Sequence, residues 1–372
     1  MHFETKAVHA AAQVDPETGA IAPPLHLSTT FQRDAQGETP RGYGYIREEN
    51  PTQDRLEEAL AAIDNAAAAL VFGSGMAAGA ALLQALPRGS HVLLPDDCYY
   101  GYIALANDYF ERWGLTFDTV AMEDLDAVRG AMKGETRVVW AESPSNPLLK
   151  VVDLVALAKL AHERGAILVV DGTFASPALQ RPIGLGADVV LHSTTKYLGG
   201  HSDVQGGSLT FAKKDALYDG TQHVRKIGGA VASPFNSWLV LRGIRTLAAR
   251  MRVHSENGMA VARFLASHER VEAVYYPGLE THPRHDVARR QMSAFGGMLS
   301  FLVRGTRADA LAVTTRTKLF LPATSLGGTE SLIEHRQSSE GPGSRTPENL
   351  LRCSVGLEHP EDLIDDLQAA LR

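Results

Sequence analysis

From residue 52 to about residue 211, short apolar runs alternate with stretches in which apolar residues recur at helical spacing. Leu56, Leu60 and Ile63 follow the helical period, and Ala69–Phe72 is a short apolar run of the strand type. Strands that alternate with helices predict an α/β fold, with a largely parallel sheet covered on both faces. The other expected helices are Met76–Leu86, Ile103–Arg112 and Leu154–Arg164, and the other expected strands are Val92–Leu94, Thr116–Val120, Val138–Trp140, Ile167–Val170, Val189–Leu191 and Ser208–Phe211.

The two ends of the chain follow different patterns. Residues 1 to about 50 are rich in Gly and Pro without clear periodicity, which is typical of a disordered tail or of an ordered arm lying on another surface. We predict an N-terminal arm at 1–50, a large domain at 51–245 and a smaller α+β domain at 246–372. The elements expected near and beyond the boundary are a long helical region at Ser237–Ala266, antiparallel-looking strands at Val271–Tyr275, Gly297–Leu302, Leu319-Phe320 and Leu351–Val355, and a last helix at Pro360–Leu371.

Charge and cysteine content exclude several classes of function. The net charge of −7, without a basic stripe, argues against a nucleic-acid partner. Cys98 and Cys353 fit neither a disulfide framework nor a metal-ligand spacing, so no metal is expected. The N-terminus lacks an apolar signal core, and no apolar run approaches the ~20 residues that span a membrane. We therefore expect a soluble, cytoplasmic protein without a membrane partner.

A lysine and a carboxylate follow two neighbouring strands. Lys196 comes just after the apolar run Val189–Leu191, where an amine is poorly solvated and can form an imine with an aldehyde. Ser193 and Thr195 offer hydroxyls to a phosphate, and Asp171 offers a carboxylate to a pyridinium nitrogen. Together these residues describe a site for pyridoxal 5′-phosphate (PLP).

A glycine-containing turn predicts a second wall of the phosphate site. Phe72–Gly79 joins an expected strand to an expected helix, so backbone N–H groups and the helix start can face an anion. The spacing matches neither the dinucleotide fingerprint nor the P-loop. A tight turn without a ligand is the alternative interpretation, but Ser193 and Thr195 favour the phosphate.

Four further features each allow two interpretations. Tyr99–Tyr102 can stack on a flat ring and pass protons, or pack a domain seam. Asn146, between two prolines, can reach a phenolate oxygen or serve turn chemistry. Arg352 lies in an apolar strand and needs an anion, either an internal carboxylate or a substrate α-carboxylate. Arg47 can complete a phosphate site in a neighbouring subunit or remain a solvated charge on a linker.

In their types and order, these motifs resemble the Cys/Met-metabolism family of PLP enzymes, which includes cystathionine γ-synthase, cystathionine γ- and β-lyases, methionine γ-lyase and homoserine sulfhydrylases. The resemblance covers nearly the whole chain. It implies PLP fold type I, the aspartate-aminotransferase-like fold, and a homotetramer of two catalytic dimers. The matching motifs are Y-x-R-x-x-N-P-T at Tyr45–Thr52, S-G-M at Ser74–Met76, Y-G at Tyr100-Gly101, S-P-x-N-P at Ser143–Pro147, V-D-x-T at Val170–Thr173, H-S-x-T-K-Y-x-x-G-H-S-D at His192–Asp203, S-L-G-G-x-E-S-L at Ser325–Leu332 and R-x-S-V-G-L-E at Arg352–Glu358.

The resemblance also implies roles for individual residues. Lys196 holds PLP and later moves protons on the substrate, and Tyr100 stacks on the ring. Asp171 pairs with the pyridine nitrogen, while Asn146 contacts the phenolic oxygen. The remaining implied contacts are Ser74, Gly75, Met76, Ser193 and Thr195 to the phosphate, Tyr45 and Arg47 to the same phosphate across a dimer interface, and Ser325 and Arg352 to the substrate carboxylate.

The chain departs from the family pattern at four places. Gly172 follows Asp171 where Asn is common, and Tyr102 stands near the substrate pocket where many members have Gly or Cys. Thr324 precedes Ser325 where enzymes that handle cystathionine often carry Glu. Arg336–Asn349 replaces the usual proline/threonine-histidine segment. We expect Tyr102 and Thr324 to contact the substrate and to disfavour cystathionine as the preferred substrate.

The expected reaction is PLP-dependent elimination or replacement at Cγ of a sulfur- or oxygen-substituted amino acid. The alternatives left open are β-elimination, sulfhydrylation of an O-acylhomoserine, and γ-cleavage of methionine or canavanine. A PLP-fold protein without catalysis is a further alternative, although the residues that the chemistry needs are all present.

Overall fold

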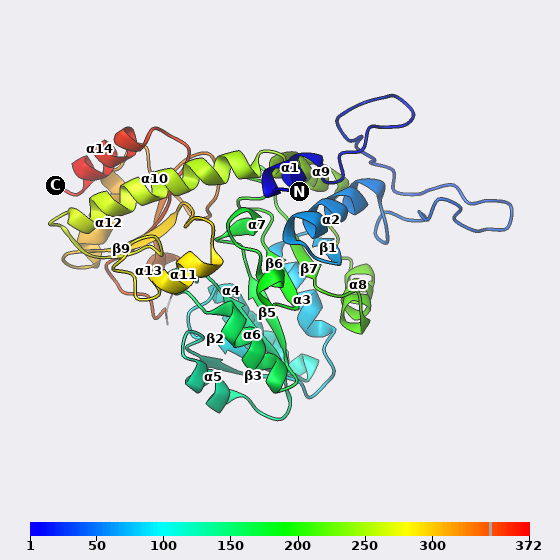
Figure 1. Ribbon diagram of the computed structural model, residues 1–372, viewed down its shortest axis with the longest axis horizontal. Helices are drawn as coiled ribbons and strands as arrows, with labels where there is room; N and C mark the ends of the chain where they lie inside the picture. The colour runs from blue at the N-terminus through cyan, green and yellow to red at the C-terminus, as the bar shows by residue number, and fades with distance from the viewer. Residues whose placement is uncertain (342–343) are drawn as a thin grey trace.

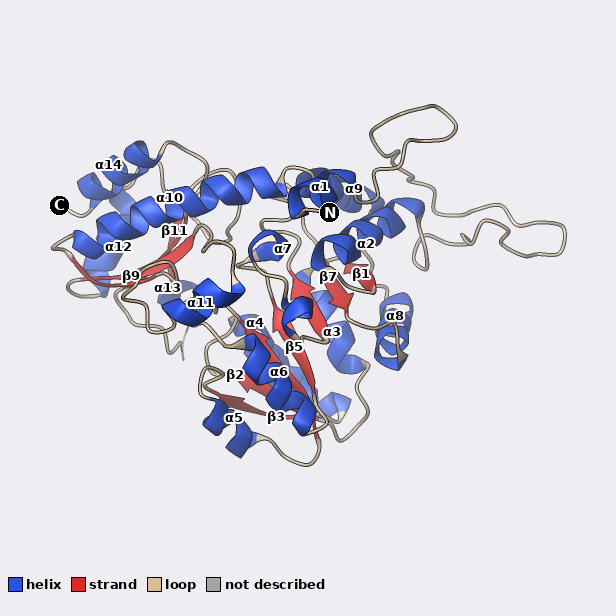
Figure 2. Ribbon diagram, viewed as in Figure 1, coloured by secondary structure: helices blue, strands red, loops and turns tan. Residues whose placement is uncertain are grey.

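The computed structural model describes residues 1–341 and 344–372 and contains two sheets flanked by helices (Figure 1, Figure 2). The larger sheet has seven strands in the order β1-β7-β6-β5-β4-β2-β3. All its neighbouring pairs are parallel except those of β7, which runs antiparallel to β1 and β6. The strands are β1 Ala68–Phe72, β2 His91–Pro95, β3 Thr116–Val120, β4 Thr136–Glu142, β5 Ile167–Asp171, β6 Val189–His192 and β7 Gly207–Phe211.

Along the strands of this sheet, alternate residues are buried on opposite faces. In β1, Leu70 and Phe72 pack in one apolar cluster, while Ala69 and Val71 pack in another. Helices α3, α4 and α8 contribute to the first cluster, and α2, α9 and α10 to the second. The helices are α1 Phe3–His9, α2 Pro51–Asp64, α3 Gly75–Gln84, α4 Tyr100–Trp113, α5 Leu125–Ala131, α6 Leu154–Glu163, α7 Ser176–Leu179, the 3₁₀ helix Pro182–Leu185, α8 Ala216–Gly228, α9 Pro234–Ile244, α10 Leu247–Ser267, α11 His285–Gln291, α12 Arg307–Arg316, α13 Arg336–Glu340 and α14 Pro360–Ala370.

The second sheet has five strands in the order β10-β11-β12-β9-β8 and is antiparallel except for the β10–β11 pair. Residues of α10, α12 and α14 pack on it in one apolar cluster. The expected α/β fold with a smaller, mostly antiparallel part is confirmed, whereas the predicted boundary near residue 245 stays a prediction. The strands are β8 Val271–Tyr275, β9 Met298–Val303, β10 Leu321–Pro322, β11 Leu332–His335 and β12 Leu350–Ser354.

Two expected elements differ from the structure. The long helix expected at Ser237–Ala266 is two helices, α9 and α10, because the chain leaves the helical path at Arg245-Thr246. Arg250 then donates to the carbonyl of Gly243 at 2.8 Å, which satisfies an acceptor freed at the end of α9.

The strand predicted at Leu319-Phe320 is wrong. The backbone N–H groups of both residues donate to the Asp366 carboxylate, at 2.9 and 3.1 Å, so strand pairing begins only at Leu321. The Asp366 carboxylate, distant in sequence, therefore takes the place of the strand hydrogen bonds that the apolar residues Leu319 and Phe320 predicted.

The segment between α1 and α2 extends away from the rest of the chain as loops (Figure 1). Several of its apolar side chains are exposed, among them Val14, Ile21 and Leu27. Exposed apolar groups on an extended segment favour an arm that lies on another surface. None of the helices in the described ranges is long and apolar enough to cross a membrane.

Candidate functional site

A cavity of about 410 Å³ lies where strands of the larger sheet end and meet the second sheet. Ligands collect at such carboxyl ends of parallel strands. The described chain brings thirteen of the fifteen predicted site residues together here; Tyr45 and Arg47 are the exceptions. The predicted residues that line the cavity are Ser74, Gly75, Met76, Tyr100, Tyr102, Asn146, Asp171, Ser193, Thr195, Lys196, Thr324, Ser325 and Arg352.

Lys196 lies in the turn that follows β6, with its amine inside the cavity. Its Nζ donates to Ser325 Oγ at 2.6 Å. Burial, helped by the nearby Arg352 guanidinium, lowers the pKa of Lys196 to about 8. A larger neutral fraction makes this amine a better nucleophile and base near neutral pH than an exposed lysine.

The start of α3 forms one wall of the cavity. Ser74 caps this helix by accepting from the N–H of Ala77 at 3.1 Å, and Gly75 is the first helical residue. A Cβ added at Gly75 would lie 3.1 Å from Ser193 Cβ, so glycine allows the helix start to approach the hydroxyl-bearing loop closely. Free N–H groups at a helix N-terminus beside the hydroxyls of Ser193 and Thr195 fit a phosphate dianion.

Asp171 ends β5 directly beside Glu142, the last residue of β4. Burial raises the pKa of both carboxyl groups, and each carboxyl is partly satisfied by backbone N–H donors such as that of Thr173, 2.9 Å from Asp171 Oδ1. Two buried carboxyls facing one cavity need a cation to stay ionised. A protonated pyridine nitrogen would provide that cation, so this wall also fits PLP.

His192 ends β6, the strand that pairs with the Asp171 strand, and no site role was predicted for it. Its Nε2 lies 3.0 Å from Oδ2 of the buried Asp64, which also accepts from Thr210 at 2.8 Å. Although burial opposes it, this carboxylate raises the pKa of His192. A Cβ at Gly172 would lie 2.9 Å from His192 Cε1, so a larger residue at this position would require the ring to shift.

The two predicted tyrosines have different environments. Tyr100, at the start of α4, is 44% exposed and therefore available to stack on a cofactor ring. Tyr102 is buried, packs on Trp140 with ring centroids 4.7 Å apart, and donates its hydroxyl to the carbonyl of Gly75 at 3.0 Å. The substrate contact expected for Tyr102 stays a prediction, and this bond favours a role in holding the α3 start.

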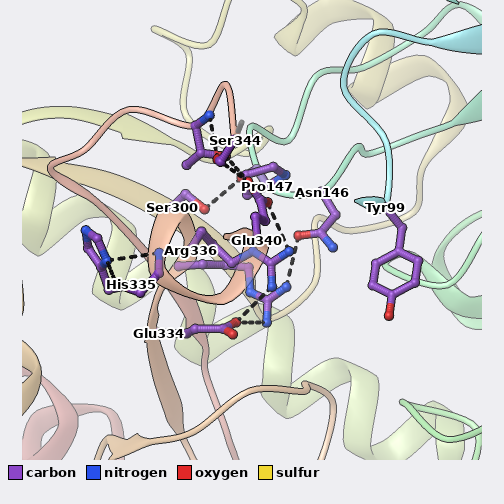
Figure 3. A network of polar contacts seen from close by, with 12 residues as sticks. Tyr99, Asn146, Pro147, Ser300, Glu334, His335, Arg336, Glu340 and Ser344 are labelled. Atoms are coloured by element: carbon purple, nitrogen blue, oxygen red, sulfur yellow. Dashed lines mark hydrogen bonds and ion pairs between the residues drawn. The ribbon is translucent and has the colours of Figure 1, made fainter. Parts of the chain in front are cut away.

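Arg352, on β12, contacts three groups at the opposite wall. It donates to Asn146 Oδ1 at 2.9 Å and to the Ser325 carbonyl at 3.1 Å, and it forms an ion pair with Glu334. Two of these partners, Asn146 and Glu334, are labelled in Figure 3. The internal carboxylate considered for Arg352 is thus present, and Arg352 still lines the cavity. Its role toward a substrate, like that of Asn146 toward the cofactor, stays a prediction.

The cavity also contains Glu142 and Arg336, and Glu334 lies behind Arg336; the sequence analysis assigned none of them to the site. Arg336 lies in the segment noted as unlike the family, which was the available signal. Glu142 ends β4 and Glu334 lies within β11, and the register of both strands is known only from the structure.

Tyr45 and Arg47 do not line this cavity in the part of the chain that is described. Arg47 donates to the Lys226 carbonyl at 2.6 Å and lies over the Tyr45 ring. Tyr45 is 48% exposed. This position on the protruding arm leaves the predicted contribution to a neighbouring subunit open.

Known proteins resemble the chain over its whole length. The family model for Cys/Met metabolism PLP-dependent enzymes matches residues 4–372. Cystathionine gamma-synthase of Mycobacterium tuberculosis is 48% identical, over 99% of this chain and 96% of the relative. Cystathionine beta-lyase of Coxiella burnetii is 42% identical, over 100% and 98%.

A solved structure agrees with these matches. The cystathionine gamma synthase of Xanthomonas oryzae pv. oryzae, in complex with aminoacrylate and cysteine, superposes with a TM-score of 0.95 at 40% identity, covering 100% of this chain and 98% of that one. The expected fold type I and the expected PLP dependence are thereby confirmed. The chain belongs to the Cys/Met metabolism family of PLP-dependent enzymes.

Proposed function

We propose that this enzyme joins an O-acylhomoserine to the thiol of cysteine, a replacement at Cγ that yields cystathionine. The observation that carries the proposal is the amine of Lys196, buried in the cavity with its pKa lowered to about 8 beside Ser325 and Arg352. Relatives named cystathionine gamma-synthase, 46–48% identical over 99% of this chain, support replacement at Cγ as the reaction.

The residues divide the work of this reaction between binding and proton transfer. Arg352 and Ser325 hold the substrate α-carboxylate, which places Cα next to the Lys196 amine. PLP, when bound, withdraws electrons from the substrate Cα. Lys196 takes the proton from Cα and, once it has passed that proton on, takes one from Cβ, so that the acyloxy group leaves Cγ as a carboxylate. The cysteine sulfur, having lost its proton, bonds to Cγ in its place, and protons return to Cβ and Cα. Asp171 would keep the pyridine nitrogen of the bound cofactor charged, and Tyr100 would stack on its ring.

The working unit that we propose is a homotetramer of two catalytic dimers. Tyr45 and Arg47 of one chain complete the phosphate site of its neighbour, which gives the protruding arm a function (Figure 1). The exposed apolar residues Val14, Ile21 and Leu27 on that arm support its burial against another chain. The cytoplasmic location expected from the sequence stays a prediction.

β-Elimination of cystathionine is the second candidate, because relatives named cystathionine beta-lyase are 42% identical. Thr324 argues against it. This cavity residue has no charge for the distal amino group of cystathionine. A neutral side chain here favours release of cystathionine as a product over its retention as a substrate.

A panel of amino acids tests the reaction. The PLP-loaded protein is given O-acetyl- and O-succinylhomoserine with and without cysteine, and separately cystathionine, methionine and canavanine, and all products are identified. We expect cystathionine from an ester plus cysteine, and 2-oxobutanoate from the ester alone. Pyruvate from cystathionine, with no γ-product from any substrate, would overturn the assignment; Lys196→Ala serves as the inactive control.

A further inference from the structure

Four side chains form a row of alternating charge beside the substrate site. Three of them, Glu334, Arg336 and Glu340, are labelled in Figure 3. Arg352 pairs with Glu334 Oε2, Arg336 Nη1 lies 3.2 Å from the same oxygen, and Arg336 Nη2 lies 3.0 Å from Glu340 Oε1. Their side chains are 4%, 6%, 3% and 11% exposed, in the order Arg352, Glu334, Arg336, Glu340. We call this row the ion-pair chain.

The two ends of the ion-pair chain lie in different places. Arg352 and Arg336 line the cavity that contains Lys196. Glu340 lies on the wall of a neighbouring cavity and accepts from the hydroxyls of Ser344 and Thr346 at 2.6 and 2.7 Å. The ion-pair chain is therefore polarised, with its positive end toward the substrate site and its negative end away from it.

A buried carboxylate next to Arg352 creates a difficulty for substrate binding. If Glu334 paired with Arg352 alone, the pair would be neutral, and Glu334 would repel an incoming α-carboxylate at short range. Arg336 contacts the same oxygen of Glu334 as Arg352 does. The charge of Glu334 is thus shared between two guanidinium groups, and Arg352 keeps attraction for a further anion.

We propose that Arg336 is a positioning residue for substrate binding, which holds Glu334 so that Arg352 remains available to the α-carboxylate. This inference rests on the role proposed above for Arg352. The buried Nε of Arg336 has no protein partner in the described structure. In keeping with a cationic influence on the site, Arg336 contributes to the lowered pKa of Lys196.

Binding of a simple carboxylate to the PLP-loaded enzyme tests this role without turnover. The probe is butanoate, which has no amino group, and its dissociation constant is measured by titration calorimetry. Arg336→Gln is expected to weaken binding about tenfold, and Arg336→Lys to restore part of the loss, because the charge but not the fork geometry returns. Arg307→Gln is the matched control. Arg307 is exposed and donates to Ser338, which lies on α13 as Arg336 does.

A double-mutant cycle separates positioning through Glu334 from a general loss of packing. In a Glu334→Gln background Arg352 has no competing carboxylate, so adding Arg336→Gln is expected to change butanoate binding by at most about twofold. Thermal unfolding and PLP content of each variant verify folding, and Arg336→Lys remains informative if Arg336→Gln does not fold.

Two outcomes would overturn the proposal: unchanged butanoate binding in the folded Arg336 variants, or the same loss with and without the Glu334 charge. Arg352→Gln distinguishes a failure of the Arg336 proposal from a failure of the proposed substrate role of Arg352. If that variant binds butanoate normally, the substrate role of Arg352 itself is wrong, whichever reaction the enzyme catalyses.

Discussion

At the scale of single residues, Ser325 is the point where the catalytic and binding groups meet. Its side chain accepts from Lys196, and its carbonyl accepts from Arg352. Its backbone has φ +91°, in the region that favours glycine, which costs about 1–3 kcal/mol for another residue type. Such strain persists where the surroundings hold the residue firmly, and here it sets the spacing of Lys196 and Arg352.

The lowered pKa of Lys196 predicts how the cofactor-free protein takes up PLP. Only the neutral amine attacks the aldehyde, so the uptake rate should rise with pH through a midpoint near pH 8 and then level off. Removing a neighbouring cation raises the pKa, so Arg352→Gln should move the midpoint to higher pH. Stopped-flow absorbance at a series of pH values measures both curves; a midpoint that Arg352→Gln shifts to lower pH would contradict this explanation.

Thr324 predicts a change of substrate preference. Thr324→Glu places a carboxylate in the cavity, where it can meet the distal amino group of cystathionine. We expect the KM for cystathionine cleavage to fall by about tenfold, with a smaller change for an O-acylhomoserine. Steady-state kinetics with both substrates compare the two effects, and an equal change for both would show that Thr324 does not contact the distal end.

At the scale of elements, the regular parts of the large sheet could be predicted from periodicity alone. The buried strands of the parallel sheet are short apolar runs, and helices such as α2 keep a strict apolar face. β11 was not predicted, because the polar residues Glu334 and His335 interrupt its apolar pattern, although both are buried in the structure. A polar residue whose partner lies on another strand cannot be recognised as buried before the register is known.

The residues of the site likewise fall into those that could be predicted from the sequence and those that could not. Lys196, Asp171 and the α3 start follow strands in the sequence, so their common location followed from the parallel-sheet rule. Arg336 and Glu334 depend on how the second sheet packs on the first, which local sequence does not encode. Resemblance to the family gave no help at Arg336, because this segment departs from the family pattern.

The contact of α9 with the loop after Lys196 predicts a destabilising substitution. A Cβ at Gly243 would lie 2.4 Å from the carbonyl oxygens of Leu198 and Gly199, so backbone must move. Gly243→Ala is expected to cost about 1–3 kcal/mol of unfolding free energy and to reduce activity by displacing Lys196. Gly228→Ala, at the end of α8 with nothing within 4 Å of the added carbon, should be neutral in the same denaturation and activity assays. Equal stability of the two variants would contradict the tight contact.

At the scale of the whole molecule, the arm and the second sheet both bear on the site. The second sheet supplies Arg352 within the chain. The arm carries Tyr45 and Arg47 outside the cavity of its own chain, as far as the chain is described. A site that draws on both sheets and on a neighbouring arm would be formed only in the assembled enzyme.

Subunit mixing tests the shared site. Lys196→Ala and Arg47→Ala chains are each expected to be nearly inactive, because one lacks the amine and the other lacks a charge-assisted contact to the phosphate worth about 2 kcal/mol. After exchange of subunits, hybrid dimers contain one site with an intact lysine and an intact arginine, so part of the activity should return. Fluorescence energy transfer between labelled chains reports the exchange of subunits. If exchange occurs and no activity returns, Arg47 is a surface charge without a role in the neighbouring site.

The central claim is that Lys196 and its neighbours direct replacement at Cγ, and proton NMR of the reaction in D₂O tests it most directly. The PLP-loaded enzyme is mixed with an O-acylhomoserine and cysteine, and solvent deuterium is located in the product. Replacement at Cγ predicts cystathionine with deuterium at both Cα and Cβ of the homoserine-derived half, since protons must leave both carbons. Failure to form cystathionine from either ester, together with pyruvate release from added cystathionine, would contradict the claim.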